Sequence, residues 1–401
     1  MKTTVLIIGG GLSGCRVLQL LSRYGIECAL VESRERLGGR VYSPPINQLG
    51  NPDPLSVTPE ATTFDADAPA VDLGPSWFWP DQPAIRALLD ELDLQSAVYA
   101  QHADGDSVLE YAGGNVMRNA GAASMAGSLR LDGGIERLIH ALTSTPHQQV
   151  GNRSAMSNTP ADTAYSSASA SLHLSTHATA ITTTADGLSV SLRRNGQDEY
   201  CRCEHVVLAL PPRLVANMEI ESSSLQGLSH KLNSVPTWMA AQAKILLTYA
   251  TPFWLDDGLS GDAFSQVGPM TEIHDATPRG STTGALFGFV GVPAAARAGQ
   301  EAALKTAAVQ QIKRLFNTPA EPLAVVLQDW AQQQLTASRS DVDMPSGRPE
   351  AGILENCTAD NRIVWAGAET AAGPHTTGLI EGAIVAAERA VRQIRDIRSA
   401  M

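Results

Sequence analysis

Three glycines and one glutamate near the N-terminus have the types and spacing needed to bind a dinucleotide. Gly9, Gly11 and Gly14 form a G-x-G-x-x-G pattern, and Glu32 follows later in the chain. The first glycine permits a tight turn, the second lets the backbone approach a pyrophosphate, and the third lets a helix pack close to a strand. The carboxylate of Glu32 can bind the hydroxyl groups of a ribose and would repel a 2′-phosphate.

The surrounding sequence supplies the elements that must position these residues. Residues 5–8 are an apolar run typical of a buried parallel strand, and a helical pattern over 15–24 follows the glycines. Residues 27–31 form a second strand. The start of the helix, with Leu12 and Ser13, offers free N–H groups and a positive dipole end to phosphates. This order of elements predicts a Rossmann-type domain.

A second cluster of glycines and arginines follows the second strand directly. Residues 36–40 read R-L-G-G-R, a pattern that is not part of a plain NAD-binding fold. It resembles the flavin-containing amine oxidase superfamily, which includes monoamine oxidases, L-amino-acid oxidases and related desaturases. There the two glycines and the final arginine lie against the FAD pyrophosphate; a basic surface turn is the alternative. The resemblance implies cofactor contacts from Ser33, Arg34, Gly38, Gly39 and Arg40.

Further segments match the same family in the same order along the chain. Residues 72–77 resemble the segment that passes the flavin ring, and residues 206–212 resemble a strand that returns to the FAD domain. Residues 363–370 and 378–383 resemble a strand, a turn and a helix whose N-terminus points at the flavin. The resemblance implies cofactor contacts from Leu73, Gly74, Pro75, Ser76, Trp77, Ala178, Pro211, Trp330, Gly367, Glu369, Thr377, Gly378 and Leu379.

Lys244 is the main candidate for a catalytic residue. It lies in an apolar, strand-like run, eight residues before Pro252-Phe253-Trp254, as a lysine does in the family. The resemblance implies that it holds a water against flavin N5. A lysine at a sheet edge is the alternative, although an unpaired buried ammonium is costly. Trp330 and His375 complete the catalytic candidates. Trp330 could instead be a core tryptophan, and His375 could face either the substrate or the solvent.

Three departures from the family pattern affect the cofactor and the substrate. Monoamine oxidases attach their flavin through a cysteine, but residues 335–340 contain none, so non-covalent FAD is expected. The two tyrosines that enclose the substrate nitrogen are absent, and Leu379 replaces one of them. The stretch between Trp77 and Arg130 is also short. A helix over 83–94 and a hairpin over 107–118 are expected there, which leaves a more open flavin face.

The resemblance implies an α/β fold in which a Rossmann-type FAD-binding domain, a parallel sheet with helices, is interleaved with a smaller α+β substrate domain. The implied function is an FAD-dependent oxidoreductase that oxidises an amine or amino acid by hydride transfer to flavin N5, with O2 reduced to H2O2. An FAD-dependent C–C desaturase or other non-amine flavoenzyme is the alternative, and a non-catalytic accessory flavoprotein is the third class. The FAD domain is expected over 1–76, 127–222 and 345–401, and the substrate domain over 77–126 and 223–344.

Composition agrees with an enzyme whose partners are a small-molecule substrate and O2. The chain has 401 residues, 43% of them hydrophobic, and a formal net charge of −12, which argues against nucleic acid and anionic membranes as partners. No membrane-spanning run or signal peptide is evident, so a cytoplasmic protein is expected. The five cysteines and nine histidines lack metal-ligand spacing, so no metal is expected. Residues 43–69 and 144–171 are expected to be loops, and the oligomeric state is not indicated.

Overall fold

The structure is a computed structural model, and its description covers nine segments of the chain. These are residues 1–49, 68–121, 123–144, 170–221, 228–343, 347–352, 354, 362–373 and 375–400. The loops predicted over 43–69 and 144–171 lie mostly outside the described residues. The elements that position the site all lie within them.

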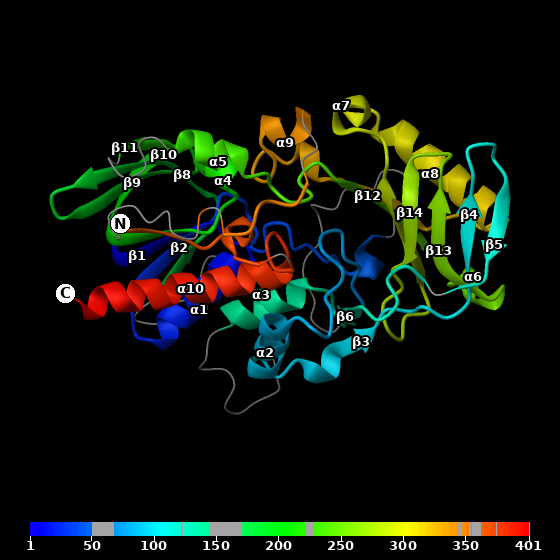
Figure 1. The fold of residues 1–401 in the computed structure, drawn as a ribbon, viewed down its shortest axis with the longest axis horizontal. Helices are drawn as coiled ribbons and strands as arrows, with labels where there is room; N and C mark the ends of the chain where they lie inside the picture. Colours follow the sequence, from blue (N-terminus) through cyan, green and yellow to red (C-terminus); the bar gives the residue numbers. More distant parts are fainter. Residues whose placement is uncertain are drawn as a thin grey trace.

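The first 31 residues fold into the predicted strand–helix–strand unit, which belongs to an eight-stranded sheet (Figure 1). The order is β11-β8-β9-β10-β1-β2-β7, with β17 also paired to β10. β10, β1, β2 and β7 run parallel, as does β17 beside β10. The strands are β1 (Lys2–Ile8), β2 (Cys28–Val31), β7 (Ala170–His173), β8 (Thr176–Thr184), β9 (Gly187–Arg194), β10 (Gln197–Leu208), β11 (Glu219–Glu221) and β17 (Ile363–Trp365).

The apolar side chains of β1 alternate between two cores, which explains the continuous apolar run in the sequence. Val5 and Ile7 pack with residues of α1 and α10 on one face. Leu6 and Ile8 pack with residues of β8, β9 and α4 on the other. The helices of this part are α1 (Leu12–Arg23), α3 (Glu136–Thr143), α4 (Pro212–Val215), α5 (Ser229–Ser234) and α10 (Ile380–Ser399).

A second, seven-stranded sheet lies toward the other end of the molecule (Figure 1). Its order is β16-β12-β15-β14-β13-β4-β5, and its pairs are antiparallel except for β13 with β4. The hairpin predicted over 107–118 is present as β4 and β5. The strands are β4 (Asp106–Glu110), β5 (Val116–Asn119), β12 (Ala243–Tyr249), β13 (Leu259–Ser265), β14 (Met270–Asp275), β15 (Gly284–Val290) and β16 (Ala324–Asp329).

The two faces of β12 have different surroundings. Ala243, Ile245 and Leu247 belong to a core cluster that includes residues of helix α8 (Glu301–Leu315). Leu246 packs in a different cluster, with Trp330 among others. β12 lies between β16 and β15, so Lys244 is not at a sheet edge, and the edge-lysine alternative is wrong. The buried Lys244 must therefore be stabilised by contacts inside the protein.

Shorter elements connect the two sheets and complete the mixed α/β fold. The helix predicted over 83–94 is α2, which ends at Glu91.

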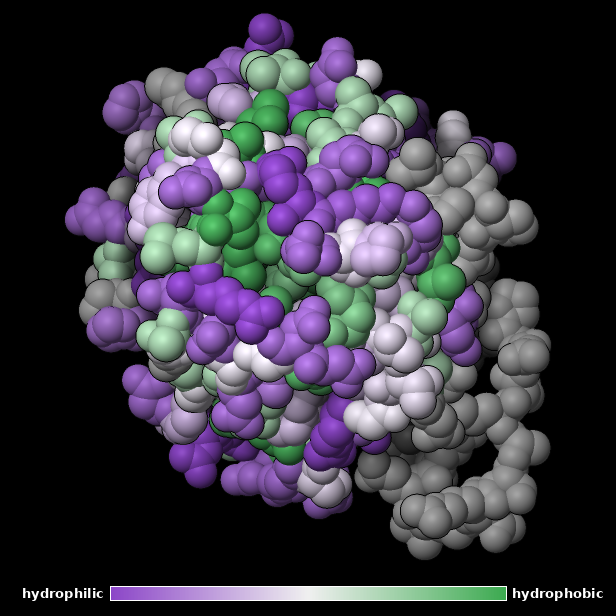
Figure 2. Space-filling view, turned by 90° about the vertical axis from the view of Figure 1, so that its right-hand side faces the viewer, coloured by the Kyte–Doolittle hydropathy of each residue, from purple (hydrophilic) through white to green (hydrophobic). Residues whose placement is uncertain are grey.

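Figure 2 faces the end of the molecule that carries the second sheet, where hydrophilic side chains surround a hydrophobic patch near the centre of the view. Among the described residues, no helix combines the length and apolar character required to cross a membrane. The remaining elements are α2 (Pro83–Glu91), β3 (Val98–Ala100), β6 (Leu129–Leu131), α6 (Phe253–Asp256), α7 (Ala294–Arg297), α9 (Arg339–Asp343) and the 3-10 helices η1 (Ile46–Gln48), η4 (Gln95–Ala97), η7 (Trp330–Gln332) and η8 (Ala368–Thr370).

The division into domains stays a prediction, although the two sheets use different parts of the chain. Described strands of the first sheet come from residues 2–31, 170–221 and 363–365. Those of the second sheet come from residues 106–119 and 243–329. The fold class is the predicted one, a Rossmann-type parallel sheet with helices together with a second α+β part.

Candidate functional site

The glycine turn between β1 and α1 leaves no room for side chains at its critical positions. Gly9 has a φ of +105°, which other residues rarely adopt. A Cβ atom on Gly14 would lie 1.9 Å from the carbonyl oxygen of Gly9. The first turn of α1 therefore packs directly on the end of β1, and Gly9, Gly11, Leu12 and Ser13 line a cavity in front of it. These are the positions that the sequence pattern assigns to phosphate binding.

Glu32 is held in place by two backbone N–H groups. Its Oε2 accepts a hydrogen bond from Gly10 N at 2.7 Å, and its Oε1 accepts one from Arg34 N at 2.8 Å. The residue is 5% exposed and lines the same cavity. Because each carboxylate oxygen has two lone pairs, both oxygens keep acceptor capacity for hydroxyl groups. This is the chemistry that binding a ribose requires.

The Gly-Gly-Arg turn, residues 38–40, packs on the glycine turn. Gly38 N donates to Gly10 O at 2.8 Å, and a Cβ atom on Gly39 would lie 3.3 Å from Gly11 Cα. The guanidinium of Arg40 contacts the carboxylate of Glu369 at two points. Both residues line the cavity, so the two ends of the chain contribute to one binding surface.

Most of the residues predicted from the sequence line one cavity of about 750 Å³. It extends from the glycine turn and the first sheet to Lys244 on the second sheet. The predicted residues that line it are Gly9, Gly11, Leu12, Ser13, Glu32, Ser33, Arg34, Gly38, Gly39, Arg40, Gly74, Pro75, Ser76, Trp77, Ala178, Pro211, Lys244, Trp330, Gly367, Glu369, Gly378 and Leu379.

Four predicted residues lie outside the lining that the described residues form. Gly14 packs against Gly9, and Leu73 is buried with its carbonyl accepting a hydrogen bond from Trp330 Nε1 at 3.2 Å. The hydroxyl of Thr377 donates within its own turn. His375 is exposed at the surface. Gly14 and Leu73 thus contact residues that line the cavity, whereas nothing in the described contacts connects the His375 side chain to it.

Lys244 is 5% exposed, and carbonyl and hydroxyl groups hold its ammonium. Its Nζ donates to Gly74 O at 2.6 Å and to Ser76 Oγ at 2.8 Å. Burial lowers the pKa of Lys244 to about 7, although the nearby Asp72 carboxylate opposes this shift. A lysine with such a pKa can hold or release a proton at Nζ near neutral pH. Its hydrogen bonds also fix the segment that carries Trp77.

The cavity has an aromatic wall, which we define as Trp77, Trp238 and Phe289. Phe289 pairs directly with Lys244 across β12 and β15. Trp238 packs on Gly378, where a Cβ atom would lie 2.7 Å from the Cβ of Trp238. Sequence reasoning missed Trp238 and Phe289 because neither lies in a recognised motif. The alternation of Phe287 and Phe289 on one strand face was the available signal for Phe289.

The lining also includes polar residues that were not predicted. His177 contacts Ser33 through Nδ1 at 2.9 Å, and Arg34 donates to Thr336 Oγ1 at 2.8 Å. Gln82 and Gln242 contribute amide groups. Within the described residues, no group of His, Cys, Asp or Glu side chains could hold a metal ion. The arrangement fits a dinucleotide cofactor that extends from Glu32 toward Lys244.

Comparisons with known proteins agree with this geometry. The model of a family described as flavin containing amine oxidoreductase matches residues 109–395, and that of an NAD(P)-binding Rossmann-like domain matches residues 7–92. The chain is 22% identical over 383 residues to a putrescine oxidase from Kocuria rosea, covering 72% of this chain and 73% of that protein. It is 27% identical over 203 residues to the flavin-containing amine oxidase B of Homo sapiens, covering 49% of this chain and 38% of that protein.

Solved structures show the same fold at low sequence identity. A structure of putrescine oxidase bound to putrescine matches with a TM-score of 0.66 and 17% identity, covering 100% of this chain and 99% of the other. The cyclohexylamine oxidase from Brevibacterium oxydans matches with a TM-score of 0.68 and 16% identity, covering 99% of each chain. The whole described architecture therefore has counterparts among solved proteins.

Proposed function

Because the chain belongs to the flavin containing amine oxidoreductase family, we propose that it oxidises a small-molecule amine and passes the electrons to O2. The protein is an FAD-dependent oxidoreductase of the amine oxidase type, and its FAD is non-covalent. Consistent with this, none of the described cysteines lines the cavity. The nature of the amine and the use of O2 are the parts that we propose.

The cavity fits FAD along its length. The glycine turn, closed to any Cβ at Gly14, would hold the pyrophosphate, and Glu32 would hold the ribose. Residues 74–77 and Gly378 would lie beside the ring system. When bound, FAD supplies a two-electron acceptor for the hydride of a substrate C–H bond. The protein must supply orientation, a binding surface and exclusion of water.

The side chains around Lys244 perform those tasks in the proposed reaction. The aromatic wall offers apolar surface that excludes water and packs against a neutral amine, the form from which a hydride can leave. Lys244 holds a proton at Nζ or gives it up near neutral pH, since its pKa is about 7. Its hydrogen bonds to Gly74 and Ser76 keep the adjoining segment in one conformation. The observation that carries the proposal is that Lys244 and the dinucleotide-binding residues line one cavity.

A desaturase acting on a carbon–carbon bond is the second candidate. Leu379 lines the cavity where monoamine oxidases have a tyrosine, so one side of the aromatic cage is replaced by an aliphatic side chain. Such a surface suits a lipophilic substrate without an amine.

Anaerobic reduction of the purified, FAD-loaded protein tests both candidates. Monoamines, diamines, amino acids and lipophilic carbon substrates are added separately while the absorbance of oxidised flavin is followed. Bleaching by an amine, with recovery and peroxide release when air is admitted, supports the proposal. Bleaching only by a carbon substrate, or by dithionite alone, contradicts it. Lys244→Met should slow the amine-dependent cycle, whereas Lys2→Met, which changes an exposed lysine on β1, should not.

A further inference from the structure

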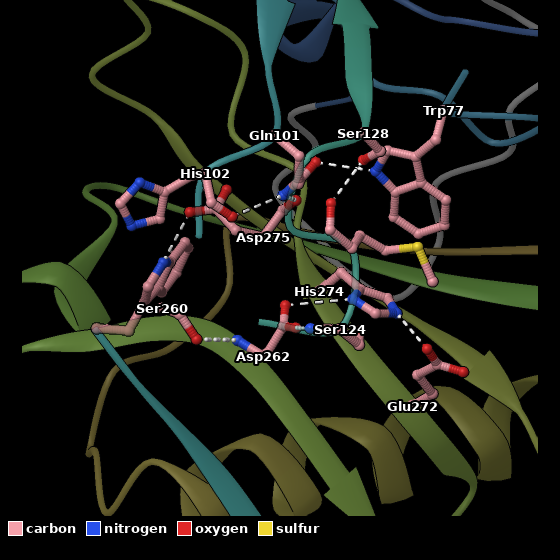
Figure 3. A network of polar contacts seen from close by, with 12 residues as sticks. Trp77, Gln101, His102, Ser124, Ser128, Ser260, Asp262, Glu272, His274 and Asp275 are labelled. Atoms are coloured by element: carbon pink, nitrogen blue, oxygen red, sulfur yellow. Dashed lines mark hydrogen bonds and ion pairs between the residues drawn. The ribbon is translucent and has the colours of Figure 1, made fainter. Parts of the chain in front are cut away.

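A buried histidine beside the cavity is held between two carboxylates (Figure 3). His274 lies on β14 and is 0% exposed. Its Nδ1 lies 3.2 Å from Asp262 Oδ1, and its Nε2 lies 3.0 Å from Glu272 Oε1. An ionised carboxylate can only accept hydrogen bonds, so both ring nitrogens must donate. With both carboxylates ionised, the ring in this arrangement is an imidazolium.

The surroundings of His274 stabilise that charge. Burial lowers its pKa, but the hydrogen bonds and charges of Asp262 and Glu272 outweigh burial, and the pKa is raised above its usual value. Asp262 is fixed by Ser124, whose backbone N donates to Oδ2 at 2.8 Å. Glu272 is partly exposed, with 32% of its side chain accessible. One carboxylate is thus rigidly built into the protein, and the other reaches the surface.

His274 contacts Trp77, a residue of the aromatic wall close to Lys244. Its ring lies 5.0 Å from the ring of Trp77, centroid to centroid, with the two planes at 80°. The indole has one further polar constraint, a hydrogen bond of 2.9 Å from Nε1 to Gln101 Oε1 (Figure 3). A cation beside an indole is attracted to its π electrons. His274 and Gln101 therefore fix different parts of the same side chain.

The strand register connects this contact to Lys244. β15 lies between β12 and β14, and its Phe289 pairs with Lys244 while its Phe287 pairs with His274. Trp77 packs against both phenylalanines. Lys244 Nζ lies 5.8 Å from the Trp77 ring centroid. Two cationic side chains on different strands thus contact one group of three aromatic rings.

We propose that His274 is a positioning residue for the active site: held as an imidazolium by Asp262 and Glu272, it fixes the indole of Trp77 beside Lys244. It does not itself line the cavity formed by the described residues. The effect on catalysis rests on the proposed function. The protonation of His274 and the position of Trp77 do not, and they can be measured without a substrate.

The first test measures protonation in the FAD-loaded protein. In 15N-histidine NMR spectra, the His274 resonances are identified by their loss in His274→Gln. Both ring nitrogens should be protonated at pH 7, and the near-UV circular dichroism of tryptophan should change in the variant. A neutral ring at pH 7 overturns the proposal, and so does an unchanged tryptophan signal. These outcomes are independent of whether amines are oxidised.

The second test is a double-mutant cycle on the rate of flavin reduction at saturating amine. His274→Gln should slow reduction about tenfold or more, because misplacement of active-site groups is costly. In a Trp77→Phe background the same substitution should add less than about twofold, since coupled residues are not additive. Equal factors in the two backgrounds overturn the proposal.

Two further variants keep the second test decisive. If His274→Gln does not fold, Glu272→Gln at a partly exposed position removes one of the two charges and should show the same non-additivity with Trp77→Phe. His205→Gln changes an equally buried histidine on β10, in the first sheet, and should leave the reduction rate unchanged. A loss as large in His205→Gln overturns the specific role of His274.

Discussion

The guanidinium of Arg40 and the carboxylate of Glu369 form a two-point ion pair across 329 positions of sequence. Arg40 Nη1 lies 2.6 Å from Glu369 Oε1, and Nη2 lies 3.1 Å from Oε2. Arg40 also donates to Trp238 O at 3.1 Å. The pair therefore joins the Gly-Gly-Arg turn, the aromatic wall and η8 in one network at the cavity.

Breaking this pair should destabilise the protein strongly. The Glu369 side chain is 0% exposed, so Arg40→Met leaves a buried carboxylate without its partner. We expect a loss of about 3–5 kcal/mol in the free energy of unfolding, measured with urea. Arg398→Met breaks a more exposed pair with Glu204 and should cost less than about 1 kcal/mol. Similar losses in the two variants would contradict the structural role given to Arg40.

Lys244 should make the stability of the apoprotein depend on pH. Its pKa falls from an ordinary 10.5 to about 7 because of burial, so between these values the folded state binds fewer protons than the unfolded state. The contribution of this group to stability is full above pH 10.5, decreases as the pH falls below that value, and is lost once the pH has fallen through about 7. Unfolding by urea between pH 6 and 10 measures it. Lys244→Met should lack this component, whereas Lys2→Met should retain it; parallel curves for wild type and Lys244→Met would refute the shift.

Gly14→Ala should prevent normal packing of α1 on β1. The new Cβ would meet Gly9 O at 1.9 Å, so the backbone must move, even though alanine favours helices. We expect a loss of about 3 kcal/mol in the free energy of unfolding and little FAD in the purified protein. Gly113→Ala has no heavy atom within 4 Å and should change stability by less than about 0.5 kcal/mol. A stable, FAD-loaded Gly14→Ala protein would disprove the close contact.

Glu32→Gln should weaken FAD binding without changing the size of the side chain. The substitution removes the charge and replaces one acceptor oxygen with a donor. Because hydrogen bonds to charged groups contribute more than neutral ones, we expect a loss of about tenfold to a hundredfold in affinity. Calorimetric titration of the apoprotein with FAD measures it. Glu27→Gln changes an exposed carboxylate just before β2 and serves as the control. Equal affinities for the two variants would remove Glu32 from the ribose site.

Local sequence patterns predicted the parts of the site that depend on backbone conformation. The glycine turn, Glu32 and the apolar run around Lys244 all carry their signal within a few residues. Trp238 was missed because it lies in a turn outside any recognised motif. Phe289 was missed because its place beside Lys244 depends on the pairing of β12 with β15. Asp262 was missed as a partner of His274 because it lies on another strand, whereas Glu272 precedes His274 by two residues on β14, where alternate residues share a face.

During synthesis, the first sheet cannot be completed until its last strand, β17, has left the ribosome. β1 and β2 lie in residues 2–31, but β17 and α10 come from residues 363–399. The second sheet needs only residues 106–329 and can assemble earlier. Until α10 arrives, Val5 and Ile7 lack much of their apolar cover, and such surface promotes aggregation. The nascent chain is therefore expected to need chaperone protection at its N-terminal strands, and its cofactor can bind only after nearly the whole chain has been made.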